Sequence, residues 1–113
     1  MKKHRKRKRD KMIKQIITLS TAHISEGTAE LLKREPKEHL MEICVYSTNN
    51  GWFIPITYLT NDRISMNIRF GNTTIPYDLR RVINYAKAKG CDWIYLNHEV
   101  EKVSELPEYN WES

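Results

Sequence analysis

Apolar residues recur with helical spacing in one segment near the end of the chain. The residues at positions i, i+3, i+4 and i+7 of this segment are Leu79, Val82, Ile83 and Ala86. This spacing places all four on one face of a helix. Pro76 suits the first turn, where no intrahelical partner is lost with its N–H, and Gly90 suits the left-handed residue that ends the helix. The pattern predicts a helix that begins at Pro76 and ends before Gly90, buried against a sheet.

Strand patterns surround this helix. Ile64, Met66, Ile68 and Phe70 alternate with the polar residues Ser65, Asn67 and Arg69. Alternation with a period of two is typical of a half-buried strand. The segment Asp92–Leu96 follows the helix and is rich in aromatic and branched residues, which predicts another strand.

The first half of the chain predicts one helix and three strands. The strands are 15–21, 40–47 and 52–59, and the last two are joined around Asn49-Asn50-Gly51, a sequence that favours a tight hairpin. Ser25 is a good N-cap for a helix over 26–35, which Pro36 is expected to end. Pro55 cannot donate to a strand ladder, so its strand should have an edge or a bulge there.

The order of these elements is β-α-β-β-(β)-α-β. It indicates an α+β fold, a ferredoxin-like split β-α-β arrangement with an extra meander strand. Two helices should cover one face of a mainly antiparallel sheet. At 113 residues the chain is expected to hold one such domain over residues 12–113, with an acidic C-terminal segment.

Charge is distributed very unevenly along the chain. Residues 1–11 hold eight basic residues and one acidic residue, a charge of +7, whereas the remaining 102 residues hold eleven basic and thirteen acidic residues, a charge of −2. The basic residues of this arm are Lys2, Lys3, Arg5, Lys6, Arg7, Lys8, Arg9 and Lys11. Such asymmetry is typical of a protein with a polyanionic partner.

The arm is expected to be disordered on its own because its charges repel one another. It has no aromatic residue, so it should bind phosphates by charge without reading bases. A solubilising tail and a nuclear localisation signal remain alternative interpretations of the same residues.

Cysteine content and hydropathy point to the cytoplasm. Cys44 and Cys91 lie in predicted strands without metal-ligand spacing, which favours buried free thiols over a disulfide. No apolar run approaches the about 20 residues that a membrane span requires. The basic start is not followed by a signal-peptide pattern.

Candidate catalytic residues are few. His23 lies at a strand-to-helix junction beside several hydroxyl residues, but no carboxylate or oxyanion hole is placed with it. Packing near an N-cap is the preferred interpretation of His23. Asp92 and His98 are six residues apart on a strand, too far to bind one metal ion. The chain also lacks a P-loop, a GxGxxG motif and an HExxH motif, so we expect no enzyme, no cofactor and no metal site.

The strand Asp92–Leu96 offers a candidate binding face. Trp93 and Tyr95 point to one side of the sheet, and the helices are expected to cover the other side. Two further aromatic residues are candidates for the same face, Trp52 and Tyr58. Together they would form a base-stacking surface like that of RNA-recognition domains, unless the acidic C-terminal segment covers it.

Four sequence blocks carry a family resemblance. They are Ser20 to Ser25 followed by Thr28-Ala29, Tyr46 followed by Gly51-Trp52-Phe53, Ala86 through Gly90-Cys91-Asp92-Trp93, and Leu106 to Trp111. Over about residues 18–111 the chain resembles an uncharacterised family of small proteins found on plasmids, phages and conjugative elements. The resemblance implies an accessory role for a mobile element in a bacterial host, a setting that includes anti-CRISPR proteins. It implies no catalytic residues.

The sequence therefore favours a non-enzymatic protein that binds nucleic acid or a ribonucleoprotein through its basic arm. Inhibition of a host defence complex would fit that role. The alternatives are a DNA-binding accessory or regulatory protein, a small nuclease that uses His23, and a protein-interaction module whose arm is incidental.

Overall fold

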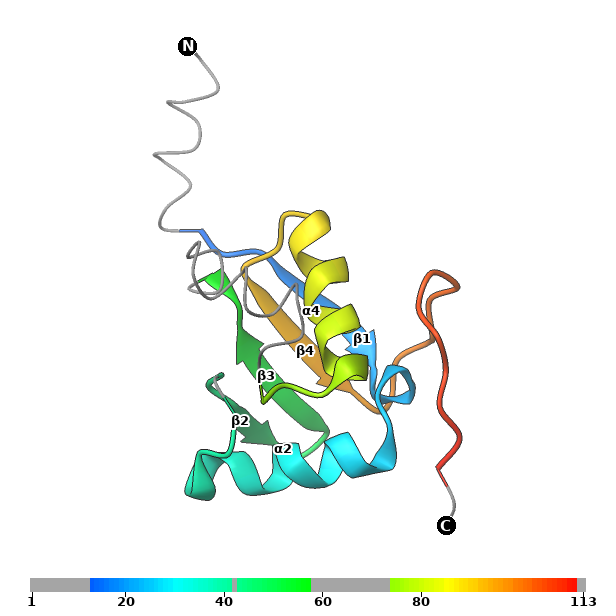
Figure 1. Cartoon of the computed structure of the whole chain (residues 1–113). Helices are drawn as coiled ribbons and strands as arrows, with labels where there is room; N and C mark the ends of the chain where they lie inside the picture. Colours follow the sequence, from blue (N-terminus) through cyan, green and yellow to red (C-terminus); the bar gives the residue numbers. More distant parts are fainter. Residues whose placement is uncertain (1–12, 42, 58–73, 112–113) are drawn as a thin grey trace.

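The computed structural model describes residues 13–41, 43–57 and 74–111, and Figure 1 shows how their elements are arranged. The elements are β1 (Ile16–Ser20), the 3-10 helix η2 (Thr21–His23), α2 (Glu26–Glu38), β2 (Tyr46–Thr48), β3 (Gly51–Pro55), α4 (Tyr77–Ala88) and β4 (Trp93–Asn97). The predicted arm 1–11 and the predicted strand Ile64–Phe70 lie outside the described residues.

The four strands form one mixed sheet in the order β1-β4-β3-β2. β1 runs parallel to β4, with Ile17 opposite Ile94. β3 is antiparallel to both β4 and β2. The α+β class is confirmed, and two of the three strand pairings are antiparallel, so that the sheet is mixed.

The strand order differs from that of a ferredoxin-like sheet. β1 and β2 point the same way and are joined through α2, so a split β-α-β unit is present, with β4 and β3 between its two strands. In a ferredoxin-like sheet the last strand lies at an edge beside the first. Here β4 lies in the interior, where its apolar residues Ile94 and Leu96 are fully buried and its backbone has a ladder partner on each side.

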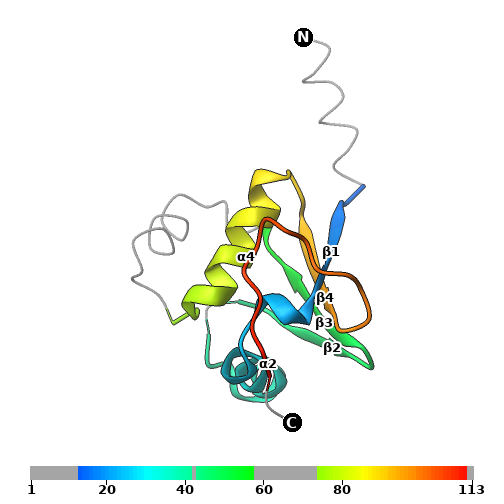
Figure 2. The same ribbon diagram turned by 90° about the vertical axis from the view of Figure 1, so that its right-hand side faces the viewer.

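One face of the sheet carries the core and both helices. The predicted apolar stripe of α4 is confirmed, since Leu79, Val82, Ile83 and Ala86 are all completely buried. α2 contributes Ala29 and Leu32 to the same cluster, and the sheet contributes Leu19, Ile54, Ile94 and Leu96. Figure 2 shows both helices on the same side of the strands.

The sequence predicted that α2 ends at residue 35, before Pro36. The helix instead continues through Pro36 to Glu38. Proline removes only one N–H from the last turn, and the helix ends at His39, a left-handed residue whose N–H donates to the Glu35 carbonyl. The buried Glu35 carboxylate then accepts the N–H groups of Leu40 and Met41, at 2.7 and 2.9 Å. These bonds hold the chain where it leaves the helix.

Two strands are shorter than predicted. The strand expected over 40–47 forms only at Tyr46–Thr48, and the next strand covers Gly51–Pro55. The hairpin between them is confirmed, with Thr48 opposite Gly51. Pro55 fits the expectation of a local edge, because β2 pairs with β3 only as far as Phe53.

Gly51 brings two strands unusually close. A Cβ at this position would lie 1.7 Å from the Leu96 carbonyl oxygen, which no side chain can tolerate. Since Gly51 is opposite Asn97, this approach fixes the register of β3 on β4.

The starts of the two helices are joined by one buried carboxylate. Ser25 caps α2 as predicted, its hydroxyl accepting the Thr28 N–H at 3.2 Å. Asp78, in the first turn of α4, accepts the Ser25 N–H at 2.6 Å and the Thr28 hydroxyl at 2.8 Å. None of the described helices is long and apolar enough to cross a membrane.

We expect Ile83→Asp to unfold the domain. Ile83 is completely buried between α4 and the sheet, and an unpaired charge there should cost several kcal/mol out of about 5–15 kcal/mol of total stability. The matched control is Asn84→Asp, which adds the same charge one residue along on the exposed side of α4. Thermal unfolding followed by circular dichroism compares them. A cooperative transition of Ile83→Asp near the wild-type temperature would contradict the assigned helix face.

We expect Gly51→Ala to destabilise the sheet by separating β3 from β4 at the Leu96 carbonyl. Gly27→Ala is the control, because a Cβ at Gly27 meets nothing closer than 3.9 Å. Urea unfolding should show a loss of at least about 2 kcal/mol for Gly51→Ala, in the range for strained backbone positions, and none for Gly27→Ala. Equal stability of the two variants would refute the role given to Gly51.

Candidate functional site

The face of the sheet opposite the helices carries a cluster of aromatic side chains. Trp93 and Tyr95 lie there as predicted, because their neighbours Ile94 and Leu96 point into the core. The register adds Phe53, which is opposite Tyr95, and Tyr46, which is opposite Phe53. We call these four residues the aromatic face. Tyr46 and Phe53 were not predicted, although their place in the alternation of β2 and β3 could have identified them.

The rings of the aromatic face contact one another across three strands. Phe53 and Tyr95 stack with their centroids 4.0 Å apart and an angle of 8° between the planes. Trp93 lies 6.0 Å from Tyr46 and 6.3 Å from Phe53, the latter edge to face. Tyr46 is 54% exposed, and the other three rings are half-buried. The cluster is therefore an ordered surface that solvent still reaches.

The C-terminal segment, residues 99–111, does not cover this face. It packs against η2 on the other side of the molecule, and Figure 2 shows it crossing in front of α4, η2 and α2. The Tyr109 N–H donates to the Ala22 carbonyl at 2.8 Å, and the Trp111 indole N–H donates to the Ile24 carbonyl at 2.9 Å. Leu106 reaches the core from this segment. The described C-terminal residues therefore leave the aromatic face open.

Trp52 does not belong to the aromatic face, contrary to the prediction. It lies opposite Leu96, in a row that points toward the helices, and it is only 9% exposed. Trp52 and Phe53 are adjacent in one strand, so they must point to opposite faces of the sheet. The other candidate, Tyr58, lies outside the described residues.

The first described hydrogen bonds of the chain lie at the Trp93 end of the sheet. All eight predicted phosphate-binding residues, from Lys2 to Lys11, lie outside the described residues. The point of attachment is described: the Gln15 carbonyl accepts the N–H groups of Asp92 and Trp93, at 2.8 and 3.1 Å. The Gln15 N–H in turn donates to the Asp92 carboxylate at 2.9 Å. These bonds fix the chain at the Trp93 end of the sheet.

His23 is buried and both of its ring nitrogens are occupied. Nδ1 lies 2.8 Å from the Pro107 carbonyl oxygen, and Nε2 accepts the Val103 N–H at 3.0 Å. A carbonyl can only accept and an amide N–H can only donate, so the contacts fit the neutral ring with its proton on Nδ1. His23 thus fastens the C-terminal segment to η2, and no ring nitrogen is left to act as a base.

The hydroxyl groups near His23 are used in capping. Ser20 accepts the Ala22 N–H, and Ser25 caps α2. Neither makes the serine–histidine contact that a nucleophile would need.

The two cysteines are not joined in a disulfide. Cys44 is exposed, contrary to expectation, because the predicted strand is not formed at that position. Burial, with a smaller effect of Asp92, raises the pKa of the Cys91 thiol, which makes it a poorer nucleophile.

The predicted separation of Asp92 and His98 is confirmed. Asp92 precedes β4 and His98 follows it, so the two side chains lie at opposite ends of one strand. Among the described residues no group of three histidine, cysteine or acidic side chains is placed to hold a metal ion.

A family model covers most of the folded part of the chain. Residues 16–111 match the C-terminal domain of DUF5983, a family of unknown function. The chain belongs to the DUF5983 family. The matched region contains all four blocks of the resemblance described above and excludes the basic arm, and the family description names no activity. No significant match is found among curated proteins or among solved structures.

We expect this DUF5983 domain not to cleave nucleic acids. Because both nitrogens of His23 are engaged, purified protein should leave labelled DNA and RNA intact with magnesium, manganese or zinc present. Gel analysis after prolonged incubation tests this. Cleavage that disappears in His23→Ala but persists in His98→Ala would establish the opposite conclusion.

Proposed function

We propose that the protein binds single-stranded nucleic acid, free or within a ribonucleoprotein, without catalysing a reaction. The basic arm supplies the attraction to phosphates, and the aromatic face supplies stacking. The observation that carries the proposal is the solvent-reached cluster of Tyr46, Phe53, Trp93 and Tyr95 on the face that neither helix covers.

The position of the rings supports a stacking role. Tyr95 and Phe53 lie on β4 and β3, the two central strands of the sheet. RNA-recognition domains likewise stack bases on aromatic residues of an open four-stranded sheet. A base stacked on an aromatic side chain contributes about 1–3 kcal/mol, more than the about 0.2–1 kcal/mol of a cross-strand pair. A cluster that served the sheet alone would gain more from being covered.

The distribution of charge along the chain supports a role of the arm in attracting phosphates. Outside residues 1–11 the chain has a charge of −2, so the domain by itself does not attract a polyanion. Lys11 is four residues from Gln15, and an extended chain of that length reaches at most about 14 Å. The chain length thus keeps Lys11 within about 14 Å of Gln15, which bonds to Trp93, so that one strand of nucleic acid can contact both surfaces.

Stacking favours single strands over duplexes. In a duplex the bases are already stacked inside the helix, whereas single-stranded RNA or DNA can present them to aromatic side chains. Binding by the arm alone would not discriminate in this way, because phosphate contacts are largely independent of sequence and structure. A duplex-binding accessory or regulatory protein is thus the second candidate, supported by the charge of the arm alone.

The cellular role follows from the resemblance to proteins of mobile elements. A ribonucleoprotein of host defence exposes single-stranded RNA together with protein, so its inhibition is the setting that would use both surfaces. Capture from host lysate with and without nuclease treatment tests this role. Recovery of a defence complex that depends on its RNA supports it, and recovery of duplex DNA alone favours the second candidate.

We expect removal of residues 1–11 to leave the fold intact and to lower the affinity for single-stranded RNA steeply. If five to seven basic residues engage phosphates, the log–log salt slope of the full chain should be about −4 to −6. Trp93→Ala should weaken binding to single strands by about 1–3 kcal/mol and leave duplex binding unchanged. Fluorescence anisotropy at two or more salt concentrations measures both effects.

Tyr77→Ala is the matched control, because Tyr77 is a 59% exposed aromatic residue on α4, away from the aromatic face. A salt-insensitive affinity that survives truncation would refute the role of the arm. An unchanged affinity of Trp93→Ala would refute the role of the aromatic face. If the acidic C-terminal segment instead holds the arm, truncation lowers stability in a salt-dependent way and nucleic-acid binding is negligible throughout.

A further inference from the structure

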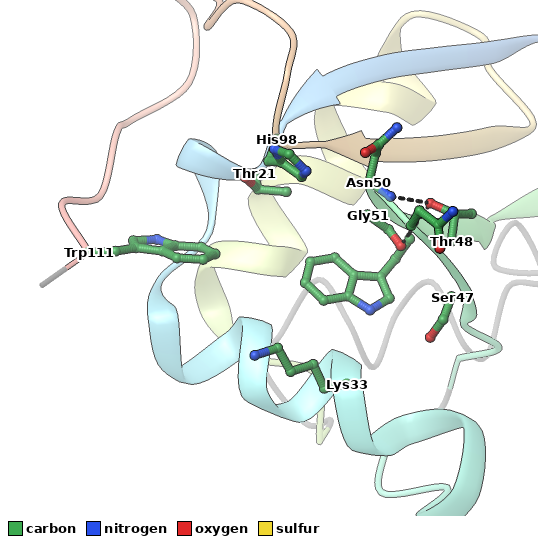
Figure 3. Close-up of a pocket in the computed structure, with 10 residues that line it drawn as sticks. Thr21, Lys33, Ser47, Thr48, Asn50, Gly51, His98 and Trp111 are labelled. Atoms are coloured by element: carbon green, nitrogen blue, oxygen red, sulfur yellow. Dashed lines mark hydrogen bonds between the residues drawn. The ribbon is translucent and has the colours of Figure 1, made fainter. Parts of the chain in front are cut away.

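A second surface with binding chemistry lies on the helix side of the sheet, near the hairpin. It is a pocket of about 380 Å³ between α2, the β2–β3 hairpin and the end of the C-terminal segment (Figure 3). Its volume falls at the lower end of the about 300–1,000 Å³ range of small-molecule sites. Trp52 and Phe53 point to opposite sides of β3, so most of the pocket lies on the other side of the sheet from the aromatic face. The two surfaces meet at Thr48, whose hydroxyl is 3.4 Å from the Tyr95 hydroxyl.

Two indole rings form walls of this pocket. Trp52 is held by the pairing of β3 with β4 opposite Leu96. Trp111 comes from the C-terminal segment, and its ring is held by the bond from its N–H to the Ile24 carbonyl. Trp111 is nevertheless 39% exposed. Trp111 therefore presents aromatic surface to the open space, and Trp52, which is only 9% exposed, contributes a smaller part of that surface.

The polar groups of the pocket favour a negatively charged ligand. Lys33 lines it from α2 and His98 from the residue after β4, and Figure 3 shows them on opposite sides of the pocket. Hydroxyl groups come from Thr21 and Ser47, whereas the Thr48 hydroxyl already donates to the Gly51 carbonyl at 3.2 Å. No acidic residue is among the described residues that line the pocket.

Lys33 is available to such a ligand. Its ammonium group is 3.5 Å from the Glu30 carboxylate, and both side chains are more than 60% exposed. An exposed pair of this kind contributes little, so an incoming phosphate can replace the glutamate without a large loss. The phosphate would also gain hydroxyl and imidazole donors that Glu30 does not contact.

We propose that this pocket binds a nucleoside monophosphate, with the base against the indole rings and the phosphate at Lys33. A planar ring that carries one anionic group can contact the indole rings and the Lys33 ammonium group at the same time. The nucleotide is either free or the 5′-terminal nucleotide of a strand. The wall formed by Trp111 is complete only while His23 fastens the C-terminal segment, so ligand binding and docking of that segment support each other.

The test is a titration of the full chain with adenosine 5′-monophosphate, followed by NMR of the three indole N–H signals. Trp52 and Trp111 report on the pocket, and Trp93 reports on the aromatic face. We expect the signals of Trp52 and Trp111 to shift and that of Trp93 to stay. Adenosine and ribose 5-phosphate should each bind at least about tenfold more weakly, because each lacks one half of the ligand.

Lys33→Ala and Trp111→Ala should each weaken the binding of adenosine 5′-monophosphate by about tenfold or more. Lys37→Ala is the control, since Lys37 is exposed on the same helix and does not line the pocket. Equal binding of adenosine and its monophosphate, or an unchanged affinity of Trp111→Ala, would overturn the proposal. A shift of Trp93 alone would also overturn it, while supporting the proposed function of the aromatic face.

A 5′-phosphorylated RNA oligonucleotide distinguishes the two sources of the nucleotide. If the terminal nucleotide is the ligand, this oligonucleotide shifts Trp52 and Trp111 and its unphosphorylated form does not. If the free nucleotide is the ligand, neither oligonucleotide shifts them, and adenosine 5′-monophosphate still does. If none of the three probes shifts the signals of Trp52 and Trp111, the proposed site is refuted. The signal of Trp93 then still reports on the aromatic face.

Discussion

The register of β3 on β4 is the constraint on which both candidate surfaces depend. Gly51 meets the Leu96 carbonyl so closely that no other residue fits, and from this point the pairing runs along both strands. It sets Phe53 beside Tyr95 on the open face and Trp52 beside Leu96 on the helix side. A slip of one residue would exchange the two aromatic side chains, since the period of a strand is two. Stability and binding chemistry thus rest on the same contact.

Buried polar groups fasten the irregular segments to this sheet. Asp78 joins the starts of both helices, Glu35 holds the chain after α2, and His23 holds the C-terminal segment. Each accepts at least one backbone N–H group in a buried or partly buried position, where a group left without a partner costs up to about 1–3 kcal/mol. Titratable groups used in this way are structural, which accounts for the burial of the carboxylates of Asp78 and Glu35 and of the ring of His23.

Local patterns predicted the elements better than their pairing. The stripe of α4, the Ser25 cap and the hairpin at Gly51 follow from spacing and turn chemistry, and all three are found. The interior position of β4 was not predictable, because it arises from pairing with strands far apart in the chain. The same long-range register decided that Phe53, and not Trp52, joins the aromatic face. Hydrogen bonds such as those of His23, 80 residues from Val103 in sequence, leave no local signal.

In the proposed function the charge lies on the arm and the stacking surface on the sheet, and this division affects which nucleic acids are bound. An arm that only neutralises phosphates binds every polyanion, and a neutral aromatic face alone binds too weakly to hold a strand. If both surfaces bind one strand, as proposed, the first contact would raise the effective concentration of the second, so that the two affinities would multiply rather than add. Salt would then weaken the phosphate contacts of the arm and leave the stacking contribution to the affinity unchanged. The preference for single strands over duplexes would therefore grow as the ionic strength rises. In the proposed function, discrimination between nucleic acids would therefore come from the aromatic face, and most of the attraction would come from the arm.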